Sequence, residues 1–127
     1  MPAMPPITVE VPPGHHRVAC AAGSVRIILD NLLRNASAAT ENAGTVRMIL
    51  RPSTDQIDVV VLNPGRLPEE LAGDGTNEPL TSTKISGLGL GVFISRQIAN
   101  QAGGSLRLAQ VGADVAATLS LPRKGAG

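Results

Sequence analysis

The segment LDNLLRNASAA, from Leu29 to Ala39, carries two asparagines four residues apart within a helical pattern. The spacing of its apolar residues predicts an amphipathic helix with an N-cap at Ser24 and an end near Thr40. The predicted apolar stripe consists of Val25, Leu29, Leu32, Ala36 and Ala39. Asn31 and Asn35 lie one turn apart at the border of this stripe. Their carboxamide oxygens are hard, neutral ligands suited to phosphate-bound Mg²⁺, although a pair of exposed structural asparagines also fits the spacing.

A second segment, SGLGLGVFISRQIA, places alternating glycines immediately before a predicted helix from about Gly89 to Gln101. Gly87, Gly89 and Gly91 let the backbone approach an anion closely, and the first free N–H groups of a helix point toward it. This pattern favours a phosphate site but also fits a flexible hinge. Gly103-Gly104 is typical of a left-handed C-terminal cap.

The remaining periodic segments predict strands. They are Ile7–Val11, Val18–Cys20, Thr45–Arg51, Gln56–Leu62, Ser105–Gln110 and Val115–Leu121, the last two forming a hairpin. Five or six short strands with two long helices on the buried face predict a two-layer α/β sandwich. We expect one domain over residues 7–122, a disordered segment over residues 1–6 and a tail over residues 123–127. The loop Asn63–Gly87 is long enough to indicate a functional segment.

Composition excludes several classes of function. The 127 residues carry 11 basic and 10 acidic side chains, which argues against a nucleic-acid binder. Phe93 is the single aromatic residue, so bases have no stacking platform. Cys20 is the single cysteine, which excludes an internal disulfide and favours a reducing, cytoplasmic location. No apolar run approaches the roughly 20 residues of a membrane span, and Met1 begins no signal peptide, so we expect this domain to make no membrane contact.

A third polar feature is Leu62-Asn63-Pro64-Gly65, at the end of a predicted strand. A polar side chain where a buried strand opens into a loop can bind the hydrogen-bonding edge of a base. An ordinary Asn-Pro-Gly turn would produce the same pattern.

In this order, the three features resemble the GHKL ATPase/kinase superfamily, and within it the catalytic domain of sensor histidine kinases. The family's LxNLLxNAxxA box is matched by Leu29–Ala39. Its TTKxxGxGLGL box is matched by Ser82-Thr83-Lys84 and Gly87–Gly91, followed by Ile94-Ser95-Arg96 and Gly103-Gly104. The resemblance covers about Val18 to Pro122. It implies the Bergerat fold, a two-layer α/β sandwich with a mixed, mostly antiparallel sheet, binding ATP under a mobile lid.

The resemblance also implies roles for individual residues. Asn35 would be the principal Mg²⁺ ligand, with Asn31 as its helper. The triphosphate would be held by Gly87, Leu88, Gly89, Leu90 and Gly91, and the lid anchored by Thr83 and Lys84. Asn63 stands where the family has an Asp that accepts from the adenine amino group, and Gly65 matches the first glycine of that box.

Three departures from the family pattern bear on ATP binding. Asn63 replaces the Asp and Leu67 stands where the second glycine would be; the lid before Glu78 is short; and Ala38 replaces a basic residue. Asn63 can accept a hydrogen bond, but without charge assistance, so the binding free energy of ATP is weaker by about 1–2 kcal/mol. That difference corresponds to ATP binding weakened roughly 5- to 30-fold.

The implied activity is phosphoryl transfer from Mg-ATP to a histidine on a separate dimerisation and phospho-acceptor domain, which then serves a response regulator in two-component signalling. Family members that hydrolyse ATP carry a Glu where this chain has Asn31, which cannot act as a base. His15 and His16 are the only histidines and sit at a strand entry, so we expect the acceptor in a preceding segment of a longer protein or in another chain. A membrane anchor elsewhere in such a longer protein is compatible with this expectation. Two alternatives remain: a degenerate domain acting as a docking module, and a stand-alone anti-sigma-type serine kinase.

Overall fold

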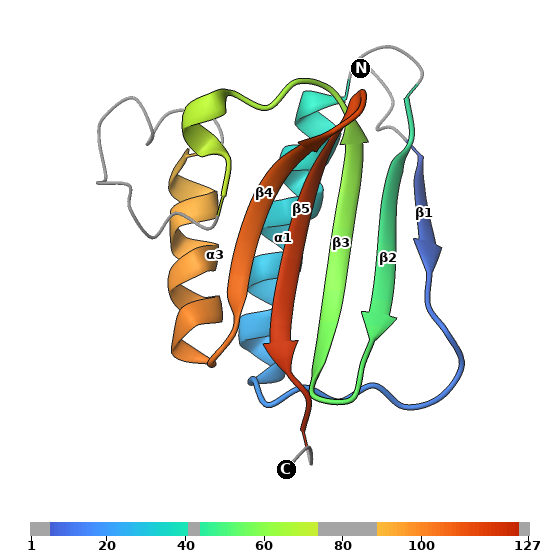
Figure 1. Ribbon diagram of the computed structural model, residues 1–127, viewed down its shortest axis with the longest axis vertical. Helices are drawn as coiled ribbons and strands as arrows, with labels where there is room; N and C mark the ends of the chain where they lie inside the picture. Colours follow the sequence, from blue (N-terminus) through green and yellow to red (C-terminus); the bar gives the residue numbers. More distant parts are fainter. Residues whose placement is uncertain (1–5, 41–43, 74–88, 125–127) are drawn as a thin grey trace.

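The computed structural model describes residues 6–40, 44–73 and 89–124. These residues form a five-stranded sheet with two α-helices packed against one of its faces (Figure 1). The strands are β1 (Ile7–Glu10), β2 (Val46–Pro52), β3 (Gln56–Pro64), β4 (Ser105–Val111) and β5 (Asp114–Pro122). The helices are α1 (Ala22–Ala39) and α3 (Gly89–Gln101), and a short 3₁₀ turn, η1 (Glu69–Leu71), follows β3. The predicted two-layer α/β sandwich is therefore confirmed.

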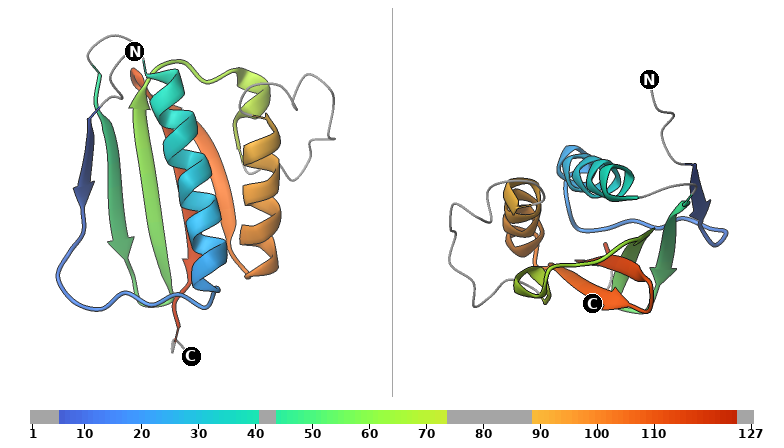
Figure 2. Two further views of the ribbon diagram at one scale, coloured as in Figure 1. Left: turned by 180° about the vertical axis from the view of Figure 1, so that it is seen from behind. Right: turned by 90° about the horizontal axis from the view of Figure 1, so that it is seen from above.

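The sheet has the order β1-β2-β3-β5-β4. β1 pairs with β2 in parallel, and the other three pairings are antiparallel, as in the predicted mixed sheet. The hairpin of β4 and β5 places β5 beside β3 at the centre of the sheet. Figure 2 shows both helices on the same side, with α3 beyond the edge of the sheet formed by β4.

The core lies between α1 and the sheet. Ile28, Leu32 and Ala36 are the buried residues of α1, and they pack on inward-facing residues such as Val61 and Leu119. Leu32 and Ala36 belong to the predicted stripe. Ile28, which that stripe omitted, is completely buried, and Ala39, which it included, is exposed. The helix is thus rotated slightly from the predicted orientation because its register is set by packing on the sheet.

Two local predictions were wrong. Helix α1 begins two residues before Ser24, with Ala21 at the N-cap and no side-chain cap, because the Ala21 carbonyl already accepts from the Val25 N–H. The predicted strand Val18–Cys20 is reduced to one isolated bridge between Val18 and Arg123. The backbone there runs beside the end of β5 and follows its edge for too short a distance to form a ladder.

Helix α3 has the predicted bounds. Gly103 adopts a φ of 84°, and the Gly104 N–H donates to the Ala99 carbonyl, as expected for the predicted glycine cap. Gly104 also packs so closely on β5 that a Cβ atom there would overlap the Ser120 carbonyl oxygen. This contact joins the end of α3 to the sheet. Within the described ranges, no helix is long and apolar enough to cross a lipid bilayer.

Candidate functional site

The three polar features found in the sequence gather at one end of the molecule. Helices α1 and α3 run in opposite directions, so the first turn of α3 lies beside the C-terminal half of α1 (Figures 1 and 2). The end of β3, which carries Asn63, reaches the same end of the sheet. Antiparallel packing of the helices therefore unites residues that are more than 50 positions apart in the chain.

Gly91 lies directly against both asparagines of α1. A Cβ atom at Gly91 would be 3.7 Å from the Asn31 Cγ and 3.7 Å from the Asn35 Nδ2. The asparagine pair and the glycine-rich start of α3 thus face each other across the helix–helix contact. The N-terminal N–H groups of α3 lie at this end of the helix, and such groups attract anions.

Ser95 fixes the carboxamide of Asn31. This serine is completely buried on α3, and its Oγ accepts a hydrogen bond from the Asn31 Nδ2 at 3.2 Å. Because the nitrogen of the carboxamide is turned toward Ser95, the Oδ1 is directed away from Ser95; it would lie 3.8 Å from a Cβ atom at Gly91. Ser95 belongs to the Ile94-Ser95-Arg96 match, but its place in the sequence predicted no role for it.

The Asn35 side chain differs from that of Asn31. Its Nδ2 is buried and has no hydrogen-bond partner among the described residues. A buried polar atom without a partner costs about 1–3 kcal/mol. Such an atom is expected where a ligand supplies the missing partner, and an oxygen of a phosphate or of a metal-bound water has the required acceptor chemistry.

A largely apolar pocket extends from Asn35 toward the end of β3 and has a free volume of about 50 Å³. Its polar side chains are Asn35, Asn63 and Arg66. Its apolar lining comes from Leu32, Ala36, Ala39, Val61, Leu67, Val92, Leu108, Val115 and Ala117. An apolar hollow with a few polar groups at its ends is the usual form of a small-molecule site.

Asn63 is 5% exposed at the far end of this pocket. Its Nδ2 donates to the Pro64 carbonyl at 3.0 Å, so the amide nitrogen is held by the adjacent backbone. A Cβ atom at Gly65 would be 3.2 Å from that Nδ2, tighter than an ordinary contact. The glycine at position 65 therefore leaves room for the Asn63 side chain.

Gln110 on β4 stabilises the loop that follows Asn63. Its Oε1 accepts from the Leu67 N–H at 2.8 Å, and its Nε2 donates to the Gly65 carbonyl at 3.0 Å. One side chain thus holds two backbone positions of the loop at the mouth of the pocket. The role of Gln110 could not be predicted from the sequence, because nothing near it marks a partner 45 residues away.

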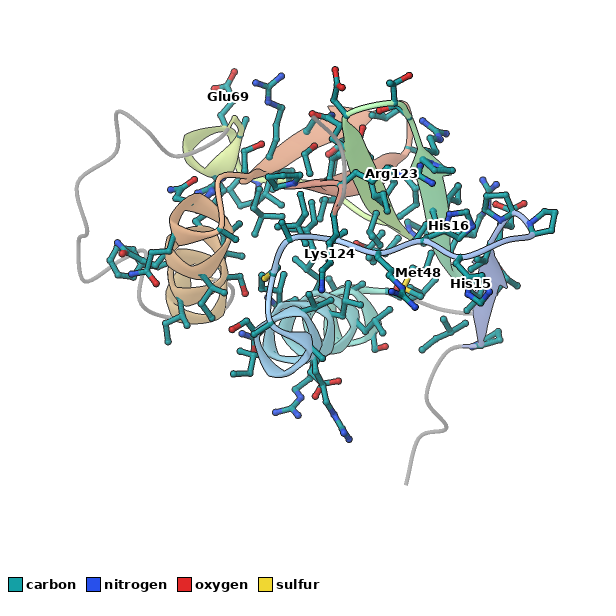
Figure 3. The ribbon with its side chains drawn as sticks, turned by 90° about the horizontal axis from the view of Figure 1, so that it is seen from below. His15, His16, Met48, Glu69, Arg123 and Lys124 are labelled. Carbon is teal, nitrogen blue, oxygen red and sulfur yellow. The ribbon has the colours of Figure 1, made fainter. Side chains whose placement is uncertain are left out.

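The other predicted residues fall into two groups. Gly89 and Leu90 form the first residues of α3, while Thr83, Lys84, Gly87 and Leu88 lie outside the described residues. His15 and His16 lie in the loop after β1, on the opposite side of the molecule from α3 (Figure 3). The His16 Nε2 is 2.9 Å from the Pro12 carbonyl oxygen. The two histidines are thus remote from the candidate site.

The chain is similar to proteins of known class. The model of the histidine kinase-, DNA gyrase B- and HSP90-like ATPase family matches residues 21–125. NtrY-like sensor histidine kinases of Rickettsia felis and Rickettsia prowazekii are 31% and 32% identical over 93 residues. In each case the match covers 71% of this chain and 15% of the relative, so the chain spans a small part of these curated relatives.

Solved structures agree with this similarity. The catalytic domain of histidine kinase ThkA superimposes with a TM-score of 0.78 at 25% identity, covering 93% of this chain and 79% of that domain. Full-length ShkA in complex with AMPPNP superimposes with a TM-score of 0.74 at 21% identity. The superposition covers 93% of this chain and 25% of ShkA, and at this identity it shows a likeness in fold alone. The predicted fold type, that of histidine kinase catalytic domains, is confirmed.

Proposed function

This chain belongs to the histidine kinase-, DNA gyrase B- and HSP90-like ATPase family, and we propose that it is the ATP-binding catalytic domain of a sensor histidine kinase. Membership of this ATPase family implies nucleotide binding. The observation that carries the proposal is the contact of Gly91, in the first turns of α3, with the carboxamides of Asn31 and Asn35. That contact brings amide oxygens and helix N–H groups to one place.

In this proposal the two ends of the nucleotide bind to different parts of the site. The triphosphate binds at the start of α3, next to Asn31 and Asn35, where backbone N–H groups and the helix dipole favour negative charge. The base enters the apolar pocket that reaches Asn63. Thr83, Lys84, Gly87 and Leu88 complete the phosphate-binding group in this proposal.

The residues present fit a Mg²⁺ ion bound together with the triphosphate. Asn35 and Asn31 offer neutral oxygen ligands, which Mg²⁺ accepts without repulsion of the phosphates. The Asn35 Nδ2, which has no partner within residues 6–40, 44–73 and 89–124, can donate to an oxygen bound there. When bound, Mg²⁺ supplies charge neutralisation for the phosphoryl group that is transferred. Ser95 contributes by keeping the Asn31 carboxamide in one orientation.

Transfer to a protein acceptor is favoured over hydrolysis. Activation of a water molecule needs a general base, and the amide of Asn31 cannot accept a proton at neutral pH. A neutral imidazole of an acceptor histidine needs no such base, so positioning and charge neutralisation suffice. We place the acceptor histidine on a separate phospho-acceptor domain, with a response regulator as the final recipient.

Calorimetric titration of the purified chain with a non-hydrolysable ATP analogue, with and without Mg²⁺, tests this function. We expect saturable binding that strengthens when Mg²⁺ is present. An affinity for the ATP analogue that does not depend on Mg²⁺ would contradict the role of the asparagine pair. The absence of any binding would favour a docking module instead.

A second experiment identifies the acceptor. The chain is incubated with labelled ATP and an isolated histidine phospho-acceptor domain from an NtrY-like kinase, and the product is treated with acid. Loss of the label in acid indicates phosphohistidine. Retention of the label would indicate a phosphoserine product, which would favour the serine-kinase alternative.

A further inference from the structure

Arg96 on α3 links three separate parts of the backbone. Its Nε donates to the Leu106 carbonyl of β4 at 3.2 Å, and its Nη2 donates to the Gly73 carbonyl at 2.7 Å. The same Nη2 is 3.5 Å from the Leu71 carbonyl oxygen. A single side chain thus joins α3, the start of β4 and the segment that follows η1.

The segment after η1 has a second connection to β4. Gly73 and Leu108 form an isolated antiparallel bridge, with the Gly73 N–H donating at 2.7 Å and the Leu108 N–H donating at 2.9 Å. Gly73 adopts a φ of 94°, which a residue with a side chain rarely takes. Residues 71–73 are therefore held on one side by this bridge and on the other side by Arg96.

Arg96 acts on a different side of α3 from the residues that meet the asparagines. It follows Ser95 directly, so it projects about 100° around the helix from the serine that binds Asn31. Helix α3 lies beyond β4, at the edge of the sheet (Figure 1). Contacts on this second side are consequently needed to fix the rotation and position of α3 relative to α1.

We propose that Arg96 is a positioning residue for binding of the nucleotide polyphosphate, because it ties residues 71–73 and β4 to α3 and so holds Gly91 against Asn31 and Asn35. The choice of ligand in this inference rests on the proposed function, whereas the backbone link does not. Arginine suits the task because its planar group donates to several carbonyl oxygens in fixed directions, which the single ammonium of lysine cannot do.

The test compares Arg96→Met with Arg96→Lys in the full 127-residue chain. Arg123→Met is the matched control, because the Arg123 Nη1 also donates to a backbone carbonyl, that of Ser53, at 3.0 Å. Arg123 lies at the end of β5, away from α3 (Figure 3). Affinities for Mg-ATP and for adenosine are measured by NMR titration, and amide hydrogen exchange is followed at Gly73 and Leu108.

We expect Arg96→Met to weaken Mg-ATP binding about tenfold, since small displacements of positioned groups are costly, and to change adenosine affinity less than about twofold. Arg96→Lys should give an intermediate loss, and Arg123→Met should affect neither ligand. Exchange at Gly73 and Leu108 should accelerate in Arg96→Met, accelerate less in Arg96→Lys and stay unchanged in Arg123→Met.

Equal losses for Mg-ATP and adenosine would overturn the inference, because they would indicate general loosening of the fold. Unchanged Mg-ATP affinity would overturn it as well. If the wild-type chain binds no nucleotide, the proposed function fails separately. In that case unaltered exchange in Arg96→Met would overturn the backbone link.

Discussion

Replacement of Asn63 by aspartate should have opposite effects on the free chain and on its nucleotide complex. The Asn63 Nδ2 donates to the Pro64 carbonyl at 3.0 Å, in a side chain that is only 5% exposed. Aspartate replaces this donor with an oxygen that faces a carbonyl oxygen. We expect the free chain to lose about 1–3 kcal/mol of unfolding free energy, which is the usual cost of an unpaired buried polar group.

The loss of unfolding free energy in Asn63→Asp should grow as the pH rises. Burial in the apolar pocket raises the pKa of an introduced carboxyl group in the folded state. The folded Asn63→Asp chain therefore holds its proton more strongly than the unfolded chain does, and its stability falls as the pH rises above about 4, the unfolded value. At neutral pH the melting temperature should be about 4–12 °C below that of the wild type.

Nucleotide binding should change in the other direction. An ionised carboxylate accepts a hydrogen bond from the adenine amino group with charge assistance, which adds about 1–2 kcal/mol and tightens ATP binding roughly 5- to 30-fold. Calorimetry with the ATP analogue and thermal melts with and without it measure both effects. Gln97→Glu is the control, because it adds the same charge at an exposed position on α3.

Two results would refute this reasoning. If Asn63→Asp leaves both the melting temperature and the ATP affinity unchanged, Asn63 does not meet the base, and the pocket has been assigned to the wrong part of the ligand. If the free chain becomes more stable, the bond to Pro64 does not contribute as described.

Three other substitutions test the asparagine pair and its surroundings. Asn35→Ala should abolish Mg-dependent ATP binding in calorimetry. Because it removes a buried nitrogen that has no partner in the described part of the chain, the unfolding free energy should stay unchanged or rise by about 1 kcal/mol. Ser95→Ala removes the acceptor of the Asn31 Nδ2, so the unfolding free energy measured with denaturant should fall by about 0.5–1.5 kcal/mol. The same variant should need a higher Mg²⁺ concentration for ATP binding, and an unchanged Mg²⁺ requirement would contradict the orienting role. Gly91→Ala should add up to about 1 kcal/mol of helix stability, since its methyl group has room in the free chain. Gly104→Ala would overlap a β5 carbonyl and should cost at least about 2 kcal/mol; similar melting temperatures for the two variants would refute this distinction.

The regular elements were predictable because each carries its own periodicity. Alternation in Gln56–Leu62 and the glycine stop after Gln101 located β3 and α3 to within two residues. The errors arose where tertiary contacts decide. Ser24 is a good capping residue, but the chain enters the helix earlier because the Ala21 carbonyl completes the first turn. Val18–Cys20 is a short apolar run like that of a strand, but its only bridge joins Val18 to Arg123, just after β5.

The candidate site was predictable only in part. The residues that our proposal assigns to ligand binding, such as Asn35 and Gly91, were found through their resemblance to family boxes, since periodicity alone left structural explanations open. Ser95, Arg96 and Gln110 received no role because each acts through bonds to segments between 10 and 64 residues away. Local patterns report secondary structure, whereas these side chains act on the packing between elements.

The two ends of the pocket differ in how well their polar groups are satisfied. The amide nitrogen of Asn63 is bonded to its own backbone, whereas the amide nitrogen of Asn35 has no partner among the described residues. A ligand that supplies a partner to Asn35 recovers a desolvation cost already present in the free chain, but at Asn63 it adds only a neutral hydrogen bond of about 0.5–1.5 kcal/mol. Binding free energy should therefore come mainly from the metal-bound phosphates. We therefore expect the loss of the family's aspartate at position 63 to be tolerable, because in the proposed site recognition depends on α1 and α3 and on the side chains that hold them together.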